Sequence, residues 1–118
     1  MDTVVQQDVF FAGKPQAWMI FEALRAQVLK AWPQTQIRVM KTCIAFDDPK
    51  PFAYVSFPPK KSMSGLWLSI GLSEMMQHPR FAMVVPVSKS RFTVHIHIEE
   101  ASQVDEELMD WIAMAKNR

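Results

Sequence analysis

Residues 91–99 read RFTVHIHIE, and this stretch decides the fold class. Its apolar residues alternate strictly with polar ones over nine positions. Because successive side chains of a strand point to opposite faces of a sheet, the pattern predicts a strand with one face in a core and one polar face. A sheet with one buried and one solvated face is typical of antiparallel pairing. We therefore expect an antiparallel sheet.

Further strands are predicted upstream of this stretch. Segments rich in apolar and β-branched residues span 37–46, 52–57 and 66–72, and proline, lysine and serine residues separate them. Residues 81–87 form another such segment. Pro86 lies within it and cannot donate a backbone hydrogen bond, so we expect an edge strand there.

Two amphipathic helices flank these strands. From Pro15, apolar residues recur three and four positions apart until just before Pro33. A second stripe of this kind spans residues 104–115, and Ser102 with Asp105 three residues later resembles a capping pair. The order helix, four to six antiparallel strands, helix predicts an α+β fold with both helices packed on one face of the sheet.

The length and composition of the chain predict a single domain. The 118 residues, of which 49% are hydrophobic, suit a single globular unit over residues 1–118, with residues 1–8 as a loose lead-in. The only cysteine, Cys43, excludes an intramolecular disulfide framework, and its apolar surroundings predict a buried structural thiol within a strand. We expect no signal peptide and no membrane span, hence a cytoplasmic protein.

Charge is unevenly distributed although its sum is only +1. Residues 38–91 carry a net charge of +5 and residues 92–118 a net charge of −4. The first segment holds eight basic residues, with aromatic residues among them that could stack on bases. A nucleic-acid-associated accessory domain is therefore one alternative, and it requires the eight basic side chains to share one face. The eight are Arg38, Lys41, Lys50, Lys60, Lys61, Arg80, Lys89 and Arg91.

The alternating strand also places two imidazoles on its polar face. His95 and His97 are two residues apart, which separates side chains of one strand face by about 7 Å. With Arg91 on the same strand and Lys41 from the basic segment, they could donate charge-assisted hydrogen bonds to an anion. With Glu99, the two histidines are instead candidate metal ligands. Solvated histidines without a specific role are the third interpretation.

Several short motifs along the chain together resemble a known family. They are Phe21-Glu22-Ala23-Leu24-Arg25, Lys41-Thr42-Cys43-Ile44-Ala45-Phe46, Phe52-Ala53-Tyr54-Val55, Val94-His95-Ile96-His97-Ile98 and Val104-Asp105-Glu106-Glu107-Leu108. Over residues 9–116 the chain resembles the bacterial domain of unknown function 5655, whose members are small cytoplasmic α+β domains without an established catalytic activity. More distantly it is similar to YdhG-like domains, some of which are described as frataxin-like iron chaperones. This sequence departs from a frataxin-type acidic ridge, because its first helix carries only Glu22 and its acidic cluster lies on the last helix instead.

We therefore expect a non-catalytic binding or interaction domain without a cofactor. Its candidate ligand residues are Lys41, Arg91, His95 and His97, and its ligand is an anionic small molecule or an acidic protein partner. An iron-handling protein using His95, His97 and Glu99 is an alternative, as is the nucleic-acid-associated domain. A homodimer through an exposed sheet edge is compatible with each of these, because an open sheet must protect its edges.

Overall fold

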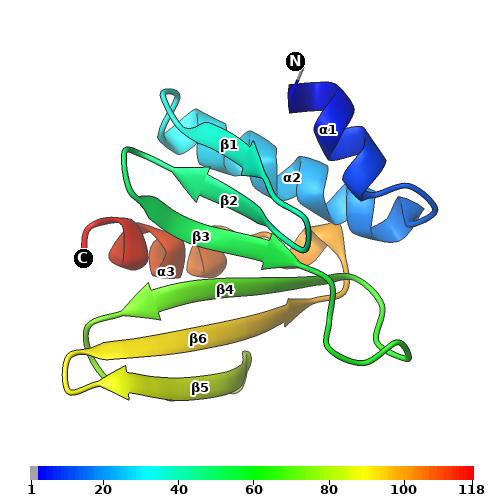
Figure 1. Cartoon of the computed structure of the whole chain (residues 1–118). Helices are drawn as coiled ribbons and strands as arrows, with labels where there is room; N and C mark the ends of the chain where they lie inside the picture. Colours follow the sequence, from blue (N-terminus) through cyan, green and yellow to red (C-terminus); the bar gives the residue numbers. More distant parts are fainter. Residues whose placement is uncertain (1–2) are drawn as a thin grey trace.

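The structure is a computed structural model, and it describes residues 3–118. Three α-helices and six strands follow one another along the chain (Figure 1). Their bounds are α1 Thr3–Phe10, α2 Pro15–Ala31, β1 Gln36–Val39, β2 Ile44–Asp47, β3 Pro51–Ser56, β4 Leu66–Leu72, β5 Phe81–Ser88, β6 Arg91–Ile98 and α3 Glu106–Lys116, with a 3₁₀ turn, η1, at Ala101–Gln103.

All six strands form one antiparallel sheet. Its order is β1-β2-β3-β4-β6-β5, so β6 returns between β4 and β5. Helices α2 and α3 lie side by side on one face of the sheet, and the described chain places no helix on the opposite face (Figure 1). We call that opposite face the open face. The predicted α+β fold with an N-terminal and a C-terminal helix on the sheet is confirmed, with the strand number at the upper end of the expected range.

The core lies between the sheet and the two helices. Phe21 and Leu24 of α2 and Leu108 and Ile112 of α3 are fully buried against it. Alternate strand positions, such as Val94, Ile96 and Ile98 of β6, supply the other half of the core, as the alternating pattern predicts. The intervening residues of β6 point to the open face, and this alternation places three of the candidate ligand residues, Arg91, His95 and His97, there.

The prediction of one strand over residues 37–46 is wrong. The chain instead forms a hairpin, in which β1 and β2 pair with each other and residues 40–43 make the turn. The Met40 backbone N–H donates to the Cys43 carbonyl oxygen at 2.8 Å, which closes this turn. Neither glycine nor proline marks it, so the sequence lacks the usual turn signal. Cys43 consequently lies in the turn and is only partly buried.

The N-terminal segment differs from the expected lead-in. Residues 1–2 lie outside the described residues, and from Thr3 the chain is helical as α1. Its last turn is held to the body of the molecule, because Gln7 is buried and its side-chain oxygen accepts a hydrogen bond from Arg25 at 2.7 Å. Phe10 stacks on Phe57 with ring centroids 5.1 Å apart, and the next residue, Phe11, is buried in the core.

The start of the last helix also differs from the predicted capping pair. Asp105 itself caps α3 by accepting a hydrogen bond from the Leu108 backbone N–H at 3.0 Å. Ser102 lies one turn earlier, inside η1. The Asp105 carboxylate is also held by Arg80, whose Nη1 atom lies 2.9 Å away. An aspartate at this position stabilises the positive end of the helix dipole.

Candidate functional site

Both candidate histidines lie on the open face, next to a tryptophan. His95 pairs with Ser69 of β4 and His97 pairs with Trp67 in the strand register. The Trp67 ring stacks on His95 with centroids 5.6 Å apart, and it lies 6.1 Å from the His97 ring. Trp67 is 9% exposed, so the three rings form a packed cluster rather than a row of solvated side chains.

Each imidazole in this cluster is already engaged by the protein. His95 Nδ1 lies 2.8 Å from the Ser69 hydroxyl, within hydrogen-bond distance. His97 Nε2 donates to the Ser64 carbonyl oxygen at 2.5 Å. Burial lowers the pKa of His95, because removal of water penalises the charged imidazolium. His95 is therefore placed to be a neutral hydrogen-bonding group near pH 7.

The metal-ligand candidates do not converge in this structure. Glu99 Oε1 lies 3.9 Å from His97 Nδ1, whereas His95 faces Ser69. Among residues 3–118, no group of three or more histidine, cysteine, aspartate or glutamate side chains is placed to hold a metal ion.

Arg91 lies at the opposite end of β6 from His97. The two are six positions apart, which corresponds to about 20 Å along a strand. There Arg91 joins Lys50 from the β2–β3 turn and Arg118, two residues beyond the end of α3, around one cavity of about 490 Å³. We call this cavity the basic pocket. Its other lining residues are Pro51, Tyr54, Ser73 and Ser90.

Two neighbouring strands separate at the end of the sheet where the basic pocket lies. Strands β3 and β4 pair from Ser56 to Tyr54 and from Trp67 to Ser69, and the pairing continues no further. The Arg118 side chain occupies the space beside the unpaired part of β4. A Cβ atom at Gly71 would lie only 3.2 Å from the Arg118 guanidinium, so glycine at this position allows the close approach.

The three cations of the basic pocket have no acidic neighbours in its lining. No carboxylate side chain is among the described residues that line the cavity. Within residues 3–118, Lys50, Arg91 and Arg118 form no ion pair, although other arginines do, such as Arg38 with Asp47 at 2.9 Å. Three uncompensated positive charges around one cavity favour an anion there.

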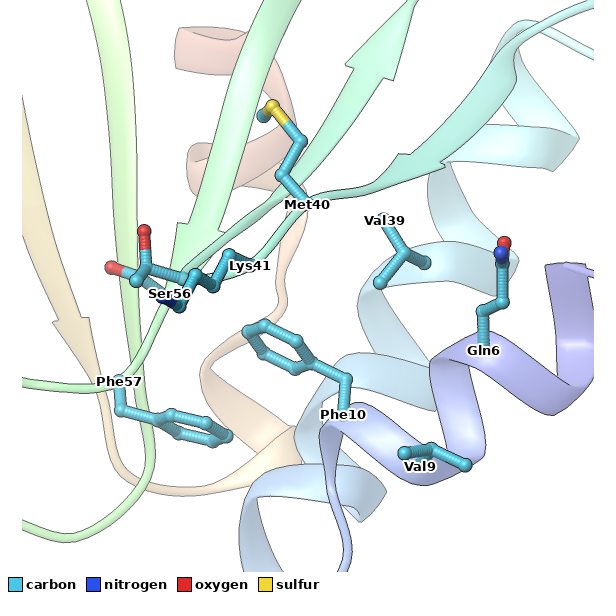
Figure 2. Close-up of a pocket in the computed structure, with 9 residues that line it drawn as sticks. Gln6, Val9, Phe10, Val39, Met40, Lys41, Ser56 and Phe57 are labelled. Atoms are coloured by element: carbon cyan, nitrogen blue, oxygen red, sulfur yellow. The ribbon is translucent and has the colours of Figure 1, made fainter.

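Lys41 lies in a different cavity, at the other end of the sheet. It belongs to the β1–β2 turn and lines a cavity of about 850 Å³ between α1, this turn and the end of β3 (Figure 2). We call this cavity the apolar pocket. Its lining residues are Gln6, Val9, Phe10, Val39, Met40, Lys41, Thr42, Ser56 and Phe57. The four predicted ligand residues therefore fall into three places: Lys41 here, Arg91 in the basic pocket, and the two histidines beside Trp67.

The eight central basic residues are divided in the same way. Lys41, Lys60 and Lys61 lie in connections at one end of the sheet, while Lys50, Lys89 and Arg91 lie at the other end. The remaining two are paired with carboxylates: Arg38 with Asp47, and Arg80 with Asp105 and Glu107.

Sequence reasoning missed two residues of the basic pocket as partners of Arg91. The sequence shows Lys50 as one of the basic residues of segment 38–91 and carries no pattern that links it or Arg118 to Arg91. Both reach the pocket through long-range packing: Lys50 through the β2–β3 turn and Arg118 through the docking of α3. The one local signal was Gly71, because a glycine inside a strand often indicates a close approach by another group.

No helix in the described chain is both long and apolar enough to cross a membrane.

Comparisons with known proteins identify the family of this chain but no more specific function. No curated protein and no solved structure matches the chain. Residues 7–115 match the family described as domain of unknown function (DUF5655), in agreement with the resemblance carried by the sequence motifs. Since that match covers most of the 118 residues, the chain belongs to the DUF5655 family.

Proposed function

We propose that this domain binds a small anionic ligand carrying a phosphate-like group in the basic pocket. The observation that carries the proposal is that Lys50, Arg91 and Arg118 line one cavity of about 490 Å³ that no carboxylate of the described residues lines. Guanidinium groups present paired N–H donors that match the spacing of phosphate oxygens. Tyr54 and the serines at the rim can add hydroxyl donors.

The distribution of charge favours a small ligand over a nucleic acid. A nucleic-acid backbone is contacted by a continuous basic surface. Here the unpaired basic residues are divided between the two ends of the sheet, and Arg38 and Arg80 are neutralised by carboxylates. A compact dianion needs only the three converging cations. We propose binding without catalysis, and we retain the cytoplasm as the expected compartment.

The proposal is tested by titrating the purified protein with inorganic phosphate and pyrophosphate in a calorimeter. Arg91→Ala and Arg118→Ala each remove one guanidinium, and each should weaken pyrophosphate binding about tenfold. Lys30→Ala removes an equal charge from the exposed surface of α2, outside the pocket, and should leave the affinity within about twofold because solvent screens distant charges.

Two results would overturn this proposal. The first is the absence of measurable binding of either anion by the wild-type protein at low ionic strength. The second is equal weakening by all three substitutions, because that would show an effect of net charge rather than of a site. Circular dichroism of each variant establishes that the fold is retained.

A further inference from the structure

The apolar pocket at the other end of the sheet is a second, chemically different cavity. Its volume of about 850 Å³ falls in the range of small-molecule sites. It shares no lining residue with the basic pocket. An inference about it therefore stands apart from the function proposed above.

The walls of this pocket are mainly hydrophobic and come from three elements. Val9 and Phe10 belong to α1, Val39 and Met40 to the end of β1, and Phe57 follows β3. Figure 2 shows the Phe10 ring projecting from α1 between Val39 and Phe57. Val9 is 69% exposed, so its apolar side chain is accessible to a ligand in the pocket.

A lysine supplies the one charge among the described lining residues. Lys41 lies in the β1–β2 turn beside Thr42, and across residues 3–118 its ammonium has no ion-pair partner. The hydroxyl of Ser56 offers a further polar group on the same side of the pocket (Figure 2). An apolar cavity with one uncompensated cation at its edge is complementary to a ligand with an apolar body and one negative charge.

A neighbouring cavity adds positive charge on the far side of Phe57. This cavity, of about 570 Å³, shares Phe57 with the apolar pocket and is lined by Lys14, Lys60 and Lys61. The Lys14 ammonium lies 4.8 Å from the centre of the Phe57 ring. The apolar pocket is thus flanked by cations on two sides, and this charge complementarity argues against a neutral ligand.

We infer that the apolar pocket binds an amphipathic monocarboxylate, such as a medium-chain fatty acid, as a free small molecule. The chain lies against Val9, Phe10 and Phe57, and the carboxylate accepts a hydrogen bond from the Lys41 ammonium. Burial of each methylene should tighten binding about fourfold. Affinity should therefore rise steeply with chain length until the pocket is filled.

The experiment titrates the full chain with octanoate, decanoate and 1-decanol below their aggregation concentrations. Decanoate, with two more methylenes, should bind roughly fifteenfold more tightly than octanoate and more tightly than the uncharged 1-decanol. Lys41→Gln should weaken decanoate binding about threefold to fivefold and leave 1-decanol unchanged. Lys89→Gln is the matched control, because Lys89 also lies in a hairpin turn but lines none of the pockets described above.

A second variant tests the location of the site without disturbing the core. Val9→Glu places a negative charge in the pocket at an exposed helix position and should abolish decanoate binding. Met19→Glu makes the same type of change at another exposed helix position, 63% exposed on α2, and should leave binding intact. Because Val9 and Met19 are both exposed, neither substitution should unfold the protein.

Three results would overturn the inference. One is that wild-type protein does not bind decanoate. Another is that decanoate and 1-decanol bind equally and Lys41→Gln affects neither, since the cation would then have no role. The third is that analytical ultracentrifugation shows a dimer that Val9→Glu dissociates, since a second copy of the chain would then cover the pocket. Pyrophosphate binding is assigned to the basic pocket, so its loss in Lys41→Gln or Val9→Glu would bear on that proposal alone. The two proposals can therefore fail separately.

Discussion

At the scale of single residues, His95 makes the stability of the fold depend on pH. Its imidazole is partly buried between Trp67 and Ser69, and burial lowers its pKa. An unfolded histidine titrates near pH 6.5, so between that value and the lower folded pKa the unfolded chain binds more protons. The free energy of unfolding should therefore fall as the pH drops below about 6.5. Urea denaturation from pH 7.5 to 5 measures this slope, which should decrease in His95→Gln.

The same residue can be followed directly in the native protein. The His95 ring proton should titrate in NMR spectra at a pH below that of a histidine in a short peptide. A midpoint at or above about 6.5 would contradict the burial argument. The alternation of residues 91–99 predicted that His95 and His97 share a face, and they do. That Trp67 would cover them could not be predicted, because the pairing of β4 with β6 joins residues that are distant in sequence.

At the scale of elements, Gly65 packs the loop before β4 closely against the end of β6. Its backbone has a φ of +88°, and a Cβ atom there would overlap the Ile98 carbonyl oxygen. Gly65→Ala should therefore combine backbone strain of about 1–2 kcal/mol with overpacking of about 1–3 kcal/mol. Gly13→Ala is the control, because Gly13 has a φ of +77° but open space around its Cβ position. Urea denaturation should show the larger loss of stability for Gly65→Ala, and equal losses would contradict the close contact.

Most elements of this fold could be predicted because their signals are local. Helix α2, strand β4 and strand β6 coincide with the predicted segments to within one residue or so at each end, since periodicity and proline residues mark them. The β1–β2 turn was missed because its residues carry no glycine or proline. Helix α1 was missed because tertiary contacts hold it in place. Phe10 packs on Phe57, and Phe11 packs in the core.

At the scale of the whole molecule, the sheet separates two cavities of opposite character. The basic pocket lies where the β2–β3 turn, the β5–β6 turn and the end of α3 meet, and the apolar pocket lies where α1 meets the β1–β2 turn. The segment charges pointed to a polarised molecule but could not locate these cavities. Folding redistributes the basic segment 38–91 between both ends of the sheet, and it places two of its arginines against carboxylates.

This separation predicts that the two proposed ligands bind independently. The pockets share no lining residue, although Tyr54 of the basic pocket and Ser56 of the apolar pocket lie two positions apart on β3, about 7 Å along the strand. Coupling between sites requires a structural element with two arrangements that both ligands bias, and the hydrogen-bonded strands β2, β3 and β4 connect the two ends as one continuous sheet. Saturating decanoate should therefore change the dissociation constant of pyrophosphate less than about twofold, as measured by calorimetry with both ligands present.

A change of more than about fivefold would require either a movement of the sheet or binding of both ligands in one pocket. Repeating the titration with Val9→Glu distinguishes these, because the effect disappears if decanoate acts from the apolar pocket and persists if it enters the basic one.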